Sequence, residues 1–143
     1  EIGTGAGLSL AWMLEGLSVG SSLTSIDNDP TLTKIATDFF GEDPRLSLLC
    51  EDGGKWIENY EGPPFDLIFA DAWPGKYSHI DETLAMVKLG GFYIIDDMNP
   101  QKNWPFGHAE KAEKLVQILE ERKDFNLTKM NWSTGVILMT KIK

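Results

Sequence analysis

The stretch "EIGTGAGLSL" (residues 1–10) decides how this chain is interpreted, because it places Gly3, Gly5 and Gly7 in one short turn. Glycine has no Cβ and adopts positive φ at no steric cost, so such a turn lets a ligand approach the backbone closely. A dinucleotide-binding turn has the spacing G-x-G-x-x-G, and its third glycine would fall at Leu8. The observed spacing favours another nucleotide-type ligand over a plain strand-to-helix turn that binds nothing.

Length and composition narrow the class of protein. The chain has 143 residues and a formal net charge of −9, which fits one domain with a single core and argues against a partner bound through phosphates. No apolar run approaches the ~20 residues of a membrane span, and no signal peptide is visible. Cys50 is the only cysteine, so the cytoplasm is the expected compartment and a buried strand is the expected place of Cys50.

The order of the predicted elements is that of an α/β protein. Short apolar runs bounded by turn residues predict buried strands at 22–27, 46–50, 65–71 and 91–96. Five segments with helical spacing are predicted as helices, and Asp29-Pro30 is placed to start the second of them. The residues that show the spacing are Leu8, Ala11, Trp12 and Glu15; Leu32, Ile35, Ala36 and Phe39; Trp56, Ile57 and Tyr60; Ile80, Leu84 and Val87; and residues 109–123. This alternation predicts a mostly parallel sheet covered by helices on both faces.

The end of the chain has a different pattern. Residues 125–132 and 135–143 are strand-like runs joined through Ser133-Thr134, which predicts a β-hairpin. Its last strand would be antiparallel and inserted at one edge of the sheet. Trp12 and Trp56 are expected to pack against the core from helix faces.

One acidic residue matches the register of the glycine turn. Asp27 ends a predicted strand twenty residues after Gly7, where a carboxylate can accept hydrogen bonds from both hydroxyls of a ribose. Asn28 and Asp29 follow it and are better explained as turn and helix-cap residues.

Carboxylates also follow the later strands, where open α/β sheets bind their ligands. Asp52 lies just past the run 46–50 and could accept a hydrogen bond from an adenine amino group, although Glu51 or a solvated turn would explain the pattern as well. Asp71, Asp96 and Asp97 follow the next two strands.

Together these features resemble the class I S-adenosylmethionine (SAM)-dependent methyltransferases. The first motif of that family is an acidic residue followed by G-x-G-x-G, which is matched by Glu1, Gly3, Gly5 and Gly7, and its ribose-binding acid is matched by Asp27. Its sheet closes with an antiparallel hairpin strand. The resemblance implies a Rossmann-like three-layer sandwich, SAM as the cofactor, and these five residues as cofactor contacts.

Within that class, "FADAWPGKY" (69–77) and "IIDDMNP" (94–100) are similar to the catechol and caffeoyl-CoA O-methyltransferases. In that family an aspartate after the fourth strand and an Asp-Asn pair after the fifth hold a divalent cation that binds a vicinal diol. The resemblance implies a site for Mg²⁺, Ca²⁺ or Mn²⁺, with carboxylates solvated at the mouth of the pocket as the alternative. The residues that match the three ligands are Asp71, Asp96 and Asp97, and Asp71 and Asp52 join the expected cofactor contacts.

Two positions depart from the family pattern. Asp97 replaces the asparagine of the pair, which makes the site more anionic. The family's lysine base would fall at Pro74, so Lys76 is the predicted base beside Asp71, with Tyr77 and His79 as other proton acceptors.

Aromatic residues near these strand ends could form the walls around a flat acceptor. They are Trp73, Tyr77, Trp104 and Phe106, the last two within the loop 99–108. His108 is expected to begin a helix and to take no part in catalysis.

The predicted function is therefore methyl transfer from SAM to an oxygen of a small, aromatic or hydroxylated acceptor, in one domain that is compatible with a homodimer. The alternatives are a tRNA methyltransferase, an NAD(P)-dependent oxidoreductase, and a domain without turnover. Because Glu1 directly precedes the glycine turn, we expect that N-terminal elements are missing from this sequence.

Overall fold

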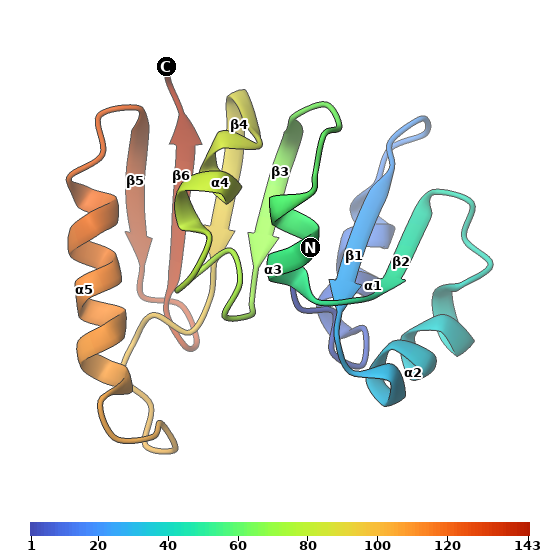
Figure 1. Ribbon diagram of the computed structural model, residues 1–143, viewed down its shortest axis with the longest axis horizontal. Helices are drawn as coiled ribbons and strands as arrows, with labels where there is room; N and C mark the ends of the chain where they lie inside the picture. Colours follow the sequence, from blue (N-terminus) through green and yellow to red (C-terminus); the bar gives the residue numbers. More distant parts are fainter. The chain divides into compact units, whose positions relative to one another are not determined.

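Helices and strands alternate through most of the chain in the computed structural model, which describes residues 1–143. The elements are α1 (Leu8–Gly16), β1 (Leu23–Asp27), α2 (Pro30–Phe40), β2 (Leu46–Cys50), α3 (Gly53–Glu58), β3 (Phe65–Ala70), α4 (Ile80–Ala85), β4 (Val87–Ile95), α5 (His108–Glu120), β5 (Phe125–Met130) and β6 (Val136–Lys141) (Figure 1). Contacts divide them into two compact units, Glu1–Tyr60 (unit 1) and Glu61–Lys143 (unit 2). None of the helices is long and apolar enough to cross a membrane.

Unit 1 is built on the parallel pair β1 and β2. The first residues of the chain run alongside β1, where Ile2 bridges Ile26 and the Gly3 amide donates to the Ile26 carbonyl at 2.8 Å. Ile2 and Ile26 are both buried. The polypeptide therefore enters the glycine turn directly from an extended segment packed on β1.

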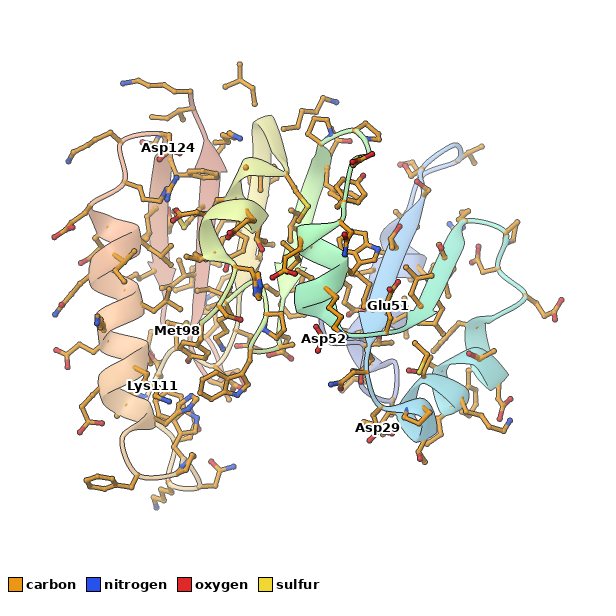
Figure 2. The ribbon with its side chains drawn as sticks, in the orientation of Figure 1. Asp29, Glu51, Asp52, Met98, Lys111 and Asp124 are labelled. Carbon is orange, nitrogen blue, oxygen red and sulfur yellow. The ribbon has the colours of Figure 1, made fainter.

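A polar side chain caps the start of α2 in unit 1. The carboxylate of Asp29 accepts hydrogen bonds from the amides of Thr31 and Leu32, at 2.8 and 3.2 Å, and Pro30 is the first residue of α2. These contacts satisfy amides that have no partner within the helix. Figure 2 shows Asp29 at the start of α2, which confirms its prediction as a cap residue.

Unit 2 contains a four-stranded mixed sheet in the order β3-β4-β6-β5. The prediction of a mostly parallel sheet is wrong: β3 and β4 are parallel, but β6 is antiparallel to both β4 and β5. The hairpin is confirmed, but β6 lies between β4 and β5 and leaves β5 at the edge. The inserted strand β6 forms two antiparallel pairs, with β4 and with β5. The named strands form two parallel pairs, β1 with β2 and β3 with β4, so parallel pairs are not in the majority.

The strand β4 begins earlier than the predicted run 91–96, since Val87 is its first residue and does not belong to the preceding helix. Val87 is buried and pairs with Phe65. The register then shifts at a bulge that contains Gly90, with φ +80°, and Gly91. A Cβ at Gly91 would lie 2.9 Å from the Asp66 carbonyl oxygen, so the close approach of the strands there requires glycine.

Two expectations about buried side chains are wrong. Cys50 is exposed at the end of β2. Trp12 is 74% exposed, because the buried residues of α1 are Leu10 and Leu14 and Trp12 points away from that face. Trp56, in contrast, is half-buried and its ring packs on Tyr60 with 4.8 Å between centroids.

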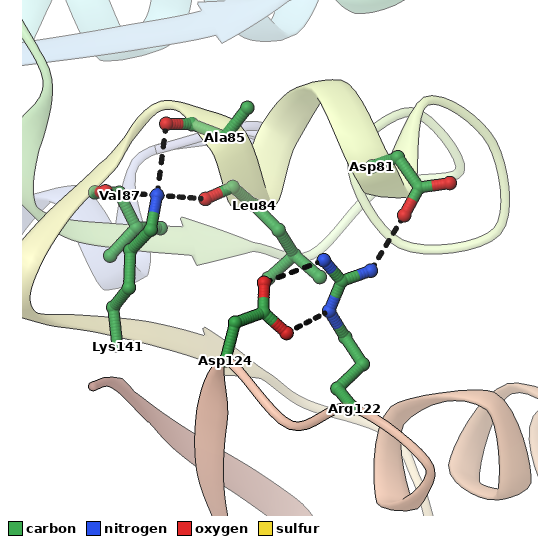
Figure 3. A network of polar contacts seen from close by, with 7 residues as sticks. All are labelled: Asp81, Leu84, Ala85, Val87, Arg122, Asp124 and Lys141. Carbon is green, nitrogen blue, oxygen red and sulfur yellow. Dashed lines mark hydrogen bonds and ion pairs between the residues drawn. The ribbon is translucent and has the colours of Figure 1, made fainter. Parts of the chain in front are cut away.

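A network of charged side chains ties α4 to the strands of unit 2 (Figure 3). The Lys141 ammonium on β6 donates to the carbonyl oxygens of Leu84, Ala85 and Val87, at 3.2, 3.2 and 2.9 Å. Carbonyl groups at the carboxyl end of a helix have no partner within the helix, and a cation there is favoured by the helix dipole. Lys141 thus fixes the junction between α4 and β4.

We expect Lys141→Met to lower the free energy of unfolding by about 1–3 kcal/mol, because it leaves carbonyl groups in this junction without their charged donor. Urea denaturation would measure the change. The matched control is Lys129→Met on β5, which breaks an exposed ion pair with Glu120 and should cost no more than about 1 kcal/mol. Equal effects of the two substitutions would contradict this role of Lys141.

Candidate functional site

The glycine turn has the conformation that its sequence predicts. Gly3, Gly5 and Gly7 have φ values of +103°, +54° and +94°, which other residues rarely adopt. A Cβ at Gly7 would lie 2.9 Å from Cε2 of Phe40, whereas a Cβ at Gly5 would meet no atom within 4 Å. Gly7 is therefore required by packing, and the backbone at Gly5 faces open space.

Asp27 and the glycine turn are joined directly. The Gly5 amide donates to Oδ2 of Asp27 at 2.8 Å, and the Asp29 amide donates to Oδ1 at 2.9 Å. Each oxygen of a carboxylate has a second lone pair, so both keep acceptor capacity for a ligand hydroxyl. The structure thus brings together two predicted site elements that are 22 residues apart.

Glu1 supports the turn from inside unit 1. Its buried carboxylate accepts hydrogen bonds from the hydroxyls of Ser9, at 2.5 Å, and Ser25. The Ser25 hydroxyl also lies 2.6 Å from that of Thr4, within the turn. These contacts connect α1, β1 and the turn through one carboxylate, so Glu1 holds the shape of the turn.

The candidates for an adenine contact lie at the start of α3 (Figure 2). Asp52 caps this helix by accepting the Lys55 amide at 2.9 Å, and Glu51 next to it is exposed. The cap explains Asp52 structurally and leaves its other oxygen as an acceptor.

A pocket of about 170 Å³ lies entirely within unit 2. It collects most of the residues predicted for an acceptor site, from the segment after β3, the segment after β4 and the start of α5. The lining residues are Asp71, Ala72, Trp73, Lys76, Tyr77, Asp97, Trp104 and His108.

Three predicted residues do not line this pocket. His79 precedes α4 and lies 3.1 Å from the Ser78 hydroxyl. Phe106 is fully exposed and is not among the residues that line the pocket. Asp96 uses its carboxylate elsewhere: Oδ1 accepts the Asp97 amide at 2.7 Å and the Thr134 hydroxyl at 2.8 Å.

The residues predicted to bind a divalent cation do not fit one. No group of three or more histidine, cysteine or acidic side chains lies close enough together to hold a metal ion. Asp71 and Asp97 line the pocket, but the Asp96 side chain is directed to the hairpin turn through Thr134. The expected three-carboxylate site is therefore not formed, because one of its ligands connects the sheet to the β5–β6 loop instead.

Lys76 is buried beside these carboxylates, with 4% of its surface exposed. Its ammonium donates to the backbone carbonyl of Asp96 at 2.5 Å. Burial lowers the pKa of Lys76, while the negative charges of Asp71, Asp97 and Asp96 act in the opposite direction. A lysine is thus held in the place where the carboxylates concentrate negative charge.

The turn that carries Lys76 is anchored to the sheet. The amides of Lys76, Tyr77 and Ser78 all donate to the Trp73 carbonyl, at 3.3, 2.8 and 3.1 Å. The hydroxyl of buried Tyr93 on β4 donates to the Gly75 carbonyl at 2.6 Å. These bonds fix the backbone on both sides of Lys76, and the hydrogen bond to the Asp96 carbonyl holds its ammonium.

His108 is the functional candidate that sequence reasoning missed. It begins α5, as expected, but it also lines the pocket, where its Nε2 lies 3.3 Å from the Tyr77 hydroxyl. Trp104 packs on its ring with 4.5 Å between centroids. Burial and the charge of Asp97 both raise the pKa of Tyr77, so its hydroxyl stays neutral. Its position at the end of the loop 99–108, beside the predicted site, was the available clue to His108.

Comparison with known proteins assigns the chain to a protein family. Residues 1–98, which include the glycine turn, Asp27 and the strand ends up to Asp97, match a family model described as a methyltransferase domain. The chain belongs to this methyltransferase family. The match to the family model covers more than half of the 143 residues of this chain.

Individual relatives agree with the family. The "Putative O-methyltransferase" of Mycolicibacterium vanbaalenii is 31% identical over 100 residues, which are 66% of this chain and 44% of that protein. A protein of the same name from Mycobacterium leprae is 30% identical over 66% of this chain and 45% of its own length. The methyltransferase chain therefore spans less than half the length of these curated relatives.

Solved structures show the same fold. The O-methyltransferase TomG from Streptomyces achromogenes, which is involved in tomaymycin synthesis and was solved with SAM, superposes with a TM-score of 0.84 over 99% of this chain and 71% of TomG, at 19% identity. The O-methyltransferase from Bacillus cereus, in complex with SAH, has a TM-score of 0.80 over 99% of this chain and 72% of its own, at 20% identity. The methyltransferase chain thus has a Rossmann-like α/β fold.

Proposed function

We propose that this protein transfers a methyl group from SAM to an oxygen atom of a small-molecule acceptor. The observation that carries the proposal is the hydrogen bond between the Gly5 amide and Asp27. It holds a carboxylate that can accept hydrogen bonds from ribose hydroxyls beside an open glycine turn. Membership of the methyltransferase family supports the reaction class, and the names of the relatives support oxygen as the methylated atom.

Unit 1 provides the groups that would hold SAM. Gly3, Gly5 and Gly7 keep side chains away from the turn, and Asp27 retains a lone pair on each oxygen for the two ribose hydroxyls. Glu1 holds the turn in shape through Ser9 and Ser25. When bound, SAM supplies an activated methyl group on a positively charged sulfur.

Two further residues complete the proposed cofactor contacts. Asp52 keeps one carboxylate oxygen for the adenine amino group while the other caps α3. Asp71 is kept as a proposed cofactor contact from the sequence pattern, and in the structure it is exposed and lines the pocket of unit 2.

Unit 2 provides the proposed acceptor site. Its pocket combines the aromatic rings of Trp73, Tyr77 and Trp104 with the charged groups of Asp71 and Lys76. Aromatic walls with few polar groups are typical of sites for flat, partly polar molecules. The proposed acceptor is therefore a small aromatic molecule that carries a hydroxyl group. A divalent cation is not part of the proposal, because the carboxylates do not assemble into a site for one.

The test measures binding and transfer in one preparation. Isothermal titration should show saturable binding of SAM and none of NADH or NADPH. Incubation with methyl-labelled SAM and a panel of small phenols and aliphatic alcohols should then label a phenol on oxygen. Saturable NAD(P)H binding without SAM binding would refute the proposal. Labelling of transfer RNA, with acceptor binding that weakens steeply as salt rises, would show instead that the acceptor is a nucleic acid.

A further inference from the structure

The arrangement around Lys76 differs from that of a metal-assisted enzyme in one specific way. The carboxylates that would surround a divalent cation are present in the sequence, but the group buried among them is the side chain of Lys76. Of the three carboxylates, Asp71 and Asp97 line the pocket with Lys76, whereas the Asp96 carboxylate binds the Thr134 hydroxyl.

The backbone of Asp96 contributes to this arrangement as well. Its carbonyl oxygen accepts a hydrogen bond from the Lys76 ammonium, which holds this cation against the backbone beside the carboxylates. A lysine ammonium has three donors, so two remain after the bond to Asp96. The rigid turn from Trp73 to Ser78 keeps the ammonium at this position.

The Lys76 ammonium and a divalent cation would compete for the same two carboxylates. A divalent cation bound to Asp71 and Asp97 would lie in the same pocket as the ammonium, and like charges repel strongly where water is partly excluded. The ammonium alone already offsets one of the two carboxylate charges. The pocket thus has its cation built into the chain.

We propose that Lys76 is the resident cation of the acceptor site, that its ammonium binds the oxygen to be methylated, and that methyl transfer requires no divalent metal. The inference rests on the proposed function for the identity of that oxygen. The acceptor binds as an oxyanion after its proton has passed to water. A lone pair of the oxyanion forms the bond to the methyl carbon, and the carbon–sulfur bond breaks with its electron pair on sulfur. Lys76 donates a hydrogen bond to the oxygen and takes no part in the bond exchange.

The first arm of the test needs no activity. Electron paramagnetic resonance of Mn²⁺ during titration of the wild-type protein should show no saturable site. Lys76→Met removes the ammonium and frees the Asp96 carbonyl, so this variant should gain an Mn²⁺ site that disappears again in Lys76→Met/Asp97→Asn. Stoichiometric Mn²⁺ binding by the wild type that is lost in Asp97→Asn would overturn the inference, whether or not the Lys76 variant folds.

The second arm measures methyl transfer. Exhaustive chelation should leave the wild-type rate within about twofold, because no metal carries the acceptor. Lys76→Met should lower kcat at least ~100-fold, the usual cost of removing one donor to a reacting oxyanion, with the Kd for SAM unchanged. Lys88→Met is the matched control, since it removes a charge from an exposed pair with Asp66 in the same unit. Loss of activity on chelation, or a folded Lys76→Met protein with the wild-type rate, would contradict the proposal.

The two proposals fail in distinguishable ways. If the wild type binds no SAM, the proposed function is wrong, and the Mn²⁺ titrations still decide whether Lys76 replaces a metal. If SAM binds and a phenol is methylated only when Mn²⁺ or Mg²⁺ is present, the proposed function stands and the role of Lys76 is refuted.

Discussion

Replacing Asp27 by alanine is expected to raise the Kd for SAM by at least about 100-fold, as measured by isothermal titration. The physical reason is the loss of hydrogen bonds from two ribose hydroxyls to a charged acceptor, each worth about 1.5–3 kcal/mol. The Gly5 amide also loses its partner on Asp27, so the turn itself becomes less ordered. Asp27→Asn keeps one acceptor oxygen without the charge and should give an intermediate Kd.

The matched control for Asp27 is Asp38→Asn. Asp38 is an exposed carboxylate in α2 of the same unit and pairs only with Lys34, four residues earlier. Its substitution should leave the Kd for SAM within about twofold, because exposed pairs contribute less than about 1 kcal/mol. A folded Asp27→Ala protein that binds SAM as tightly as the wild type would show that this carboxylate does not hold the ribose.

Replacing Gly7 by alanine is expected to lower the free energy of unfolding by about 2–5 kcal/mol. Part of this cost is the φ of +94°, which is unfavourable for a residue with a Cβ by about 1–2 kcal/mol. The rest is the new Cβ, which would lie 2.9 Å from the ring of Phe40 in a packed region, a crowding that costs about 1–3 kcal/mol. Urea denaturation followed by circular dichroism would measure the change.

The control for Gly7 lies at the other end of the same helix. Gly16 is the last residue of α1, and a Cβ there would meet no atom within 4 Å. Gly16→Ala should therefore be neutral or stabilise the protein by up to about 1 kcal/mol. If both substitutions changed the stability equally, the requirement for glycine at position 7 would not come from its packing against Phe40.

Most helices and strands were predictable because the interactions that form them are local. The glycine turn, the Asp29-Pro30 start of α2 and the hairpin residues all act within a few positions of themselves. The predictions failed where a distant partner decides. Val87 reads as the next position of a helix face, yet it pairs with Phe65 and begins β4. The strand order of unit 2 was likewise not predictable, because β6 inserts between β4 and β5 and its pairing with β4 joins distant segments of the chain.

The candidate site was likewise predicted from the sequence only in part. The spacing from Gly7 to Asp27 predicted a shared site, and the bond from Gly5 to Asp27 confirms that these segments meet. The cation site did not follow from Asp71, Asp96 and Asp97, because sequence positions at strand ends do not say where each side chain points. The Thr134 hydroxyl, 38 residues further along, draws the Asp96 carboxylate to the hairpin.

The sequence by itself determined the reaction class that this protein resembles, since glycine spacing and strand-end carboxylates are read directly from the order of residues. Only the tertiary structure decided which charges share the pocket of unit 2. Lys76 is buried next to Asp96, and His108 faces Tyr77, because chain segments 20 and 31 residues apart pack together. The positions of these groups are set by nonlocal contacts, which no spacing along the chain encodes.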